Sequence, residues 1–128
     1  MALTMVQIQN KINTLTRQKN NYTSERNKYK DSFKYANTLV RDLSNSDDYL
    51  NSSNDYLKKY FTINNKTADS GEINKTKNEI NSILKKLNNT IIPSINSNIN
   101  TLNTKINNID REIRELKRQL ETTQKKYI

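Results

Sequence analysis

Apolar side chains return every three or four residues along almost the whole chain, and this spacing most strongly limits how the chain can fold. From Met5 to Phe61, alternating steps of three and four residues visit seventeen positions, and thirteen of them are apolar or aromatic. The chain as a whole is 32% apolar, so about six apolar positions would be expected without a pattern. The spacing therefore predicts one long amphipathic helix over residues 3–61.

A second stripe of the same kind predicts another long helix over residues 71–126. Its positions are Ile73, Ile80, Leu84, Leu87, Ile91, Ile95, Ile99, Leu102, Ile106, Ile109, Ile113, Leu116 and Leu120. Between Leu87 and Ile99 the steps are all four residues long, and Pro93 lies inside this irregular stretch. Proline removes a backbone donor and clashes with the preceding turn, and a changed repeat alters the local supercoil. We therefore expect the second helix to kink or restart near residues 90–93.

Residues 62–70 separate the two stripes and predict a short loop. Asp69 and Glu72 have the spacing of a capping box at the start of the second helix, with Ile73 opening its apolar stripe. Two helices of similar length joined by a short loop favour an all-α fold, an antiparallel two-helix hairpin that forms one domain over residues 1–128. Poor helix formers gather at residues 43–55, so a break there, giving three helices, is the alternative.

The residue types present exclude several kinds of site. The chain has no cysteine and no histidine, which excludes a disulfide framework and argues against zinc and against the usual nucleophile and base pairs. We therefore expect no enzyme, no cofactor and no metal site. The N-terminal stretch lacks a basic region and a long apolar run, so we expect no signal peptide and no membrane-spanning helix. The expected location is the cytoplasm, with co-secretion without a signal peptide as a further possibility.

A second apolar face beside the main stripe is the candidate binding surface. It is rich in tyrosine, a residue type enriched at protein interfaces because one end of its side chain is apolar and the other polar. One interpretation is that these residues only widen the hairpin core; the other is that they bind a further helical chain. The candidate partner-binding residues are Phe33, Tyr35, Leu39, Tyr49, Tyr56, Tyr60, Phe61, Ile63, Ile83 and Ile92.

In its length, its lack of cysteine and its paired helices, the chain resembles the small α-helical proteins of bacterial type VII secretion, the WXG superfamily. It is most similar to the Lap proteins, the α-helical partners of LXG-domain toxins. The superfamily's Trp-x-Gly turn corresponds to residues 60–63, where Phe61 stands for the Trp and Ile63 for the Gly. The family's C-terminal Tyr-x-x-x-Asp/Glu export signal is absent, since only Ile128 follows Tyr127.

The resemblance implies a targeting chaperone that binds the N-terminal helical domain of an LXG-type toxin, with or without a second small helical protein, and delivers it to the export ATPase. The alternative is a structural coiled coil or self-associating helical protein with no export role. Nucleic acid is a less favoured partner: the net charge is +9 and residues 17–34 are basic, but Tyr22, Tyr29 and Phe33 lie on the core stripe, away from any bases. A membrane-surface helix is also disfavoured, because the stripe is narrow and the chain has no tryptophan.

Overall fold

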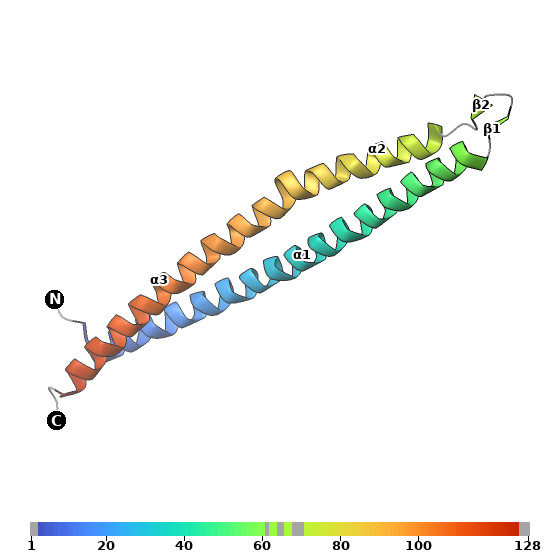
Figure 1. Ribbon diagram of the computed structural model, residues 1–128. Helices are drawn as coiled ribbons and strands as arrows, with labels where there is room; N and C mark the ends of the chain where they lie inside the picture. Colours follow the sequence, from blue (N-terminus) through green and yellow to red (C-terminus); the bar gives the residue numbers. More distant parts are fainter. Residues whose placement is uncertain (1–2, 61, 64–65, 68–70, 126–128) are drawn as a thin grey trace. The chain divides into compact units, whose positions relative to one another are not determined.

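The computed structural model describes residues 3–60, 62–63, 66–67 and 71–125, and it is almost entirely helical (Figure 1). The elements are helix α1 (Met5–Tyr60), strands β1 (Thr62–Ile63) and β2 (Lys66–Thr67), helix α2 (Gly71–Lys86), the π-helical turn η1 (Leu87–Ile91) and helix α3 (Ile92–Lys125). The predicted all-α class is confirmed at this level. The two short strands were not predicted; they pair antiparallel, with Thr62 opposite Thr67.

Helix α1 begins with a reciprocal cap that the sequence analysis missed. The Thr4 backbone N–H donates to Gln7 Oε1 at 2.9 Å, and the Gln7 N–H donates to Thr4 Oγ1 at 3.1 Å. This is the Thr-x-x-Gln form of the capping box. The corresponding prediction for the second helix depends on Asp69, which lies outside the described residues.

Helix α1 continues without a break through residues 43–55, so the three-helix alternative is not realised. Serines usually weaken a helix because their hydroxyls compete for backbone groups. Here the Ser46 hydroxyl donates to the Asp42 carbonyl and the Ser53 hydroxyl to the Tyr49 carbonyl, both at 3.1 Å. These bonds stay within the helix, so the two serines are accommodated without a change of backbone path.

The π-helical turn η1 lies where the apolar spacing becomes irregular. The Ile92 N–H donates to the carbonyl of Leu87, five residues earlier, which is the π-helical pattern. The extra residue lets the regular spacing resume from Ile92 rather than from Ile91. Accordingly Ile91 is 43% exposed and Ile92 is half-buried, so the prediction of Ile91 on the core stripe is wrong.

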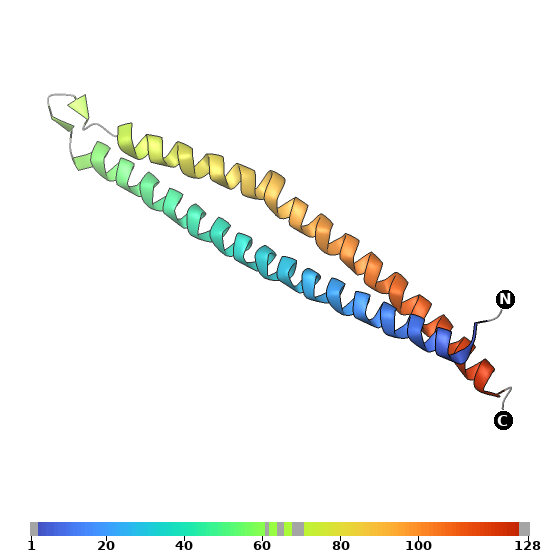
Figure 2. The same cartoon turned by 180° about the vertical axis from the view of Figure 1, so that it is seen from behind.

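The chain forms two compact units, and the first combines residues 1–31 with residues 96–128. Ile8 and Ile12 of α1 and Ile109 and Ile113 of α3 form its buried cluster, and Ile8 is only 1% exposed. Figures 1 and 2 show these two helix segments side by side from opposite directions. Lys19 Nζ lies 2.7 Å from Asp110 Oδ1, so charged groups continue the contact beyond the apolar cluster.

The second unit comprises residues 32–95 and has a more polar contact between its helices. Asn54 Nδ2 donates to Asn74 Oδ1 at 2.9 Å, and the Lys77 ammonium donates to Asn51 Oδ1. Two buried side-chain oxygens, Oδ1 of Asp47 and Oδ1 of Asn54, have no hydrogen-bond partner. An unpaired buried polar atom is costly; the second unit contains these two, and the first unit contains one, Nε of Arg26.

A helix that crosses a bilayer needs about 20 consecutive, mostly apolar residues. Within the described part of the chain, no helix is long and apolar enough to cross a membrane.

Candidate partner-binding surface

Buried and exposed apolar side chains are divided unequally between the two units. Of the eight buried hydrophobic residues in the described part of the chain, six belong to the first unit, and Ala36 and Leu87 belong to the second. Of the eight large hydrophobic residues that are exposed among those described, only Val6 belongs to the first unit. The other seven are Tyr35, Leu39, Tyr49, Tyr56, Tyr60, Ile83 and Ile91. The first unit therefore contains most of the core, and the second presents most of the exposed apolar surface.

The structure places all the described candidate residues in the second unit. Six of them are exposed: Tyr35, Leu39, Tyr49, Tyr56 and Tyr60 on α1, and Ile83 on α2. Phe33 and Ile92 are half-buried. Ile63 contributes its backbone to β1, and Phe61 lies outside the described residues. The structure thus places six of the candidates on α1, five of them exposed, and it adds Ile91, which the sequence analysis placed in the core.

A second face of α1 has a regular spacing of its own, and all its members are exposed except the half-buried Ser53. The positions are Tyr35, Leu39, Asp42, Ser46, Tyr49, Ser53, Tyr56 and Tyr60, separated alternately by four and three residues. We call this set the tyrosine face. Each of its members through Tyr56 lies one residue before a main-stripe position, so the face is turned about 100° from the main stripe. Its spacing is that of a coiled-coil seam, and among the described residues of the second unit no other helix covers its four tyrosines, which are exposed.

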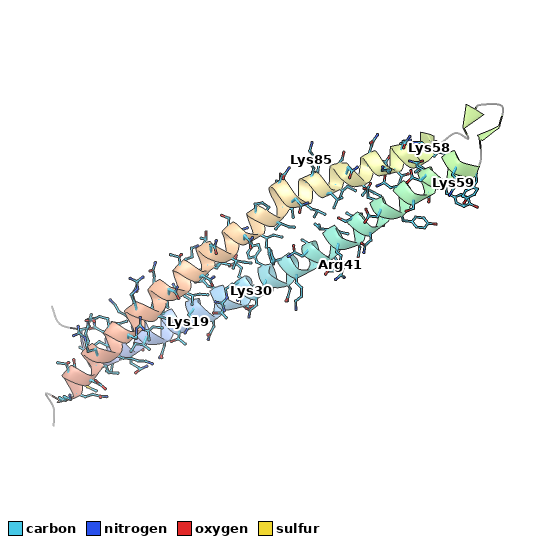
Figure 3. The ribbon with its side chains drawn as sticks, in the orientation of Figure 1. Lys19, Lys30, Arg41, Lys58, Lys59 and Lys85 are labelled. Atoms are coloured by element: carbon cyan, nitrogen blue, oxygen red, sulfur yellow. The ribbon has the colours of Figure 1, made fainter. Side chains whose placement is uncertain are left out.

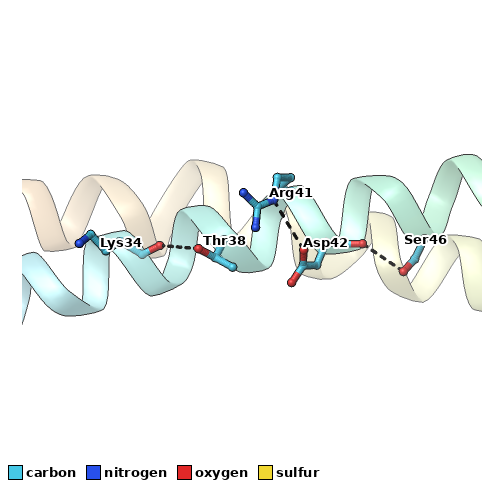
Figure 4. A network of polar contacts seen from close by, with 5 residues as sticks. All are labelled: Lys34, Thr38, Arg41, Asp42 and Ser46. Atoms are coloured by element: carbon cyan, nitrogen blue, oxygen red, sulfur yellow. Dashed lines mark hydrogen bonds and ion pairs between the residues drawn. The ribbon is translucent and has the colours of Figure 1, made fainter.

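The small polar residues of the tyrosine face are compatible with burial. A buried hydroxyl without a partner would cost free energy, but the hydroxyls of Ser46 and Ser53 already donate to backbone carbonyls of α1. Figure 4 shows this part of the helix, where the hydroxyl of Thr38 likewise donates to the Lys34 carbonyl. Of the three small polar side chains Asp42, Ser46 and Ser53, the carboxylate of Asp42 is therefore the one that needs a charged or hydrogen-bonding partner if the face is covered.

Two tyrosines at the end of α1 are already ordered by each other. The ring centroids of Tyr56 and Tyr60 are 4.7 Å apart, with the planes tilted by 43°. The Lys59 ammonium lies 5.3 Å from the centroid of the Tyr60 ring, within the range of a cation–π interaction. Figure 3 labels Lys59 near the C-terminal end of α1. Rings held in place before binding lose less conformational entropy when a partner covers them.

Charge is also divided unequally between the units. The first has thirteen basic and six acidic residues, a net charge of +7, whereas the second has nine basic and seven acidic residues, a net charge of +2. The exposed apolar surface thus belongs to the less charged unit, where association meets less electrostatic repulsion.

One ion pair of the first unit shifts the pKa values of its two members. Arg118 Nη2 donates to Glu115 Oε1 at 2.6 Å. This bond lowers the pKa of the Glu115 carboxyl below its ordinary value and raises the pKa of Arg118.

The first unit also has a groove of about 540 Å³, but its residues offer little chemistry. It is lined by Asn10, Lys11, Thr14, Leu15, Glu112, Glu115 and Leu116. One of its two carboxylates, Glu115, is already bonded to Arg118. No group of three acidic, histidine or cysteine residues suited to a metal ion occurs within residues 3–60 and 71–125 or the two short strands. The tyrosine face is therefore the better candidate for a functional site.

No protein-family model, curated protein or solved structure matches this chain. The candidate surface therefore depends on the sequence pattern and on the geometry of the described residues.

Proposed function

We propose that this chain is a helical partner protein, a targeting chaperone that binds the N-terminal helical domain of an LXG-type toxin and helps deliver it to the type VII secretion system. It is an antiparallel helical hairpin, bent near Pro93, and it acts by binding alone, without enzymatic activity, cofactor or metal. It works in the cytoplasm and leaves the cell, if at all, in company with the toxin. The observation that carries the proposal is the exposed apolar surface of the second unit.

The distribution of apolar residues supports a binding role. Single exposed apolar residues are common on proteins, whereas a concentration of them marks an interaction site. The four tyrosines of the tyrosine face are between 56% and 76% exposed. Because the first unit has its own isoleucine cluster, the chain can fold before its partner arrives. The second unit then offers the partner an apolar surface.

Binding of this kind follows the helix-in-groove mode, in which apolar side chains at helical spacing pack against the apolar surface of another chain. A toxin whose N-terminal domain consists of amphipathic helices would bury its apolar stripes against the second unit. The combined surface, with or without a second small helical protein, is then presented to the export ATPase. The size, helical content and lack of cysteine that underlie the resemblance to Lap proteins support this toxin as the partner.

Co-purification with the N-terminal helical domain of an LXG-type toxin tests the proposal. Replacing Tyr56 and Tyr60 by Asp places charge on the apolar surface, and we expect the variant to lose binding while it keeps the helical far-ultraviolet circular dichroism spectrum of the wild type. Val6→Asp is the matched control, since Val6 is also an exposed apolar residue of α1 but lies in the first unit. Loss of binding by the control, or retention by the tyrosine variant, would contradict the proposal.

Light scattering of the isolated chain tests the alternative of a self-associating coiled coil. A targeting partner is expected to be monomeric at micromolar concentration and to change mass only when the toxin domain is added. A stable homo-oligomer that ignores the toxin domain would instead indicate a structural assembly protein.

A further inference from the structure

We propose that the tyrosine face binds one helix of a different polypeptide chain, and that this helix carries a lysine or arginine opposite Asp42. The inference rests on the proposed function in one respect, that the face binds a protein, and it adds the form and charge of the bound segment. It also assigns Asp42 a role in selecting the partner and setting its register.

The spacing and length of the tyrosine face fit a helix. A seam with alternating steps of three and four residues is complementary to another helix with the same repeat, whereas a strand would present side chains at a period of two. The face extends over residues 35–60 of α1, which corresponds to about 39 Å at a rise of about 1.5 Å per residue. The bound helix therefore has about seven turns.

The area of the face is suited to a stable contact. Four tyrosines and Leu39 supply on the order of 600 Å² of exposed side chain, given about 200 Å² for a whole tyrosine and the exposed fractions of these residues. A standard interface buries about 800 Å² on each partner. One helix along the face, with some contact to the half-buried main stripe, reaches that range.

Charge favours a different chain over a second copy. Each copy has a net charge of +9, so two copies repel at long range. In a parallel pair of identical faces, the Asp42 carboxylates would also lie opposite each other, and like charges at such a position disfavour pairing. A partner with a basic residue at that position removes this repulsion and supplies an opposite charge.

Within α1, Asp42 forms a long, exposed ion pair with Arg41. The Arg41 Nε lies 3.7 Å from Asp42 Oδ1, beyond hydrogen-bond distance, and both side chains are largely exposed. The hydroxyls one turn away on either side are already used, since Thr38 donates to the Lys34 carbonyl and Ser46 to the Asp42 carbonyl (Figure 4). Covering the carboxylate with apolar atoms alone would be costly. A lysine or arginine on the bound helix meets this requirement.

Binding of synthetic helical peptides tests the inference. Each peptide has about 28 residues and one heptad stripe of leucine and isoleucine, with Lys, Leu or Glu at the stripe position seven residues from one end. In one version this position lies near the N-terminus of the peptide and in the other near its C-terminus, so that both parallel and antiparallel binding are tested. Fluorescence anisotropy at low nanomolar peptide limits self-association of the peptide.

We expect one Lys peptide to bind the wild type about tenfold more tightly than its Glu counterpart. Asp42→Lys should reverse this order, Asp42→Asn should remove it, and Asp replacement of Tyr56 and Tyr60 should abolish binding of all peptides. Equal binding of the Lys, Leu and Glu peptides, or no binding, would overturn the inference. So would a dimer of the wild type that Tyr56→Asp and Tyr60→Asp abolish, since the occupant would then be a second copy.

The peptide result is separable from the toxin result. A charge-selective peptide interaction together with failure of the toxin domain to co-purify would refute the proposed function and leave this inference standing. If the toxin domain co-purifies but Asp42→Lys changes the binding of neither the toxin domain nor the peptides, this inference is refuted and the proposed function stands.

Discussion

Replacing Asn54 by Leu is expected to stabilise the protein, although Asn54 makes a hydrogen bond. Asn54 lies on the main stripe of α1 in the second unit, half-buried, with Leu50 and Leu57 at the neighbouring stripe positions. Its Nδ2 donates to Asn74 Oδ1, while its own Oδ1 is buried without a partner. The substitution removes both the favourable bond and the unpaired oxygen, so the sign of the effect depends on their relative sizes.

Three contributions determine the expected change in the free energy of unfolding. Removing the unpaired buried oxygen contributes about 1–3 kcal/mol, and losing the bond to Asn74 costs about 0.5–1.5 kcal/mol. Asn74 is exposed, so water replaces the lost partner. A half-buried leucine contributes about 1 kcal/mol. We therefore expect a net stabilisation of about 2 kcal/mol.

Urea denaturation followed by far-ultraviolet circular dichroism measures this change. Asn81→Leu is the matched control, because Asn81 is exposed on α2 and the same substitution there alters helix propensity without filling the contact between helices. The control should change the free energy of unfolding by less than about 0.5 kcal/mol. If Asn54→Leu destabilises the protein, or if it behaves like Asn81→Leu, the interpretation of a weak polar contact in the second unit is refuted.

Two further predictions concern the first unit. Ile8→Ala should lower the free energy of unfolding by about 3 kcal/mol, since Ile8 is 1% exposed within the isoleucine cluster. Val6→Ala, at an exposed position of the same helix, should change the free energy of unfolding by less than about 0.5 kcal/mol. Similar effects of the two substitutions in urea denaturation would contradict the assignment of the core. Arg118→Gln should raise the pKa of Glu115, because the bond from Arg118 is the main cause of its lowered value. A carboxyl with a lowered pKa in the folded state stabilises the protein above its unfolded-state pKa and loses that contribution as pH falls through the folded-state pKa. Titration of the Glu115 carboxyl by NMR checks the shift, and an unchanged pKa in the variant would refute this cause.

The periodic spacing was sufficient to predict the helices and their approximate ends. Helix α1 ends at Tyr60, one residue before the predicted end, and α2 begins at Gly71 as predicted. The sequence signal was strong because a stripe sustained over many turns depends little on any one residue. The Thr-x-x-Gln pattern of the cap is also present in the sequence at Thr4 and Gln7, but it was not among the predicted features.

The structure around Pro93 could not be worked out from the spacing alone. Three steps of four residues are compatible with a kink or a restart of the helix, and the spacing does not say which isoleucine is exposed in either case. The backbone forms the π-helical turn η1, which exposes Ile91 and half-buries Ile92. Likewise, the sequence identified the tyrosines as a second face, but not whether another part of the chain covers them. That outcome depends on the packing of α1 against α2, which spacing within one helix does not determine.

Hydrogen–deuterium exchange of the chain, alone and with the toxin domain, tests most directly whether the second unit is the binding surface. In the free chain, amides of α1 near Ile8 and Ile12 should exchange more slowly than those near Asn54, because the isoleucine cluster is better packed than the polar contact. On binding, added protection should concentrate in residues 35–60. Protection confined to residues 1–31 and 96–125, or no change anywhere in residues 35–60, would contradict this account of the protein.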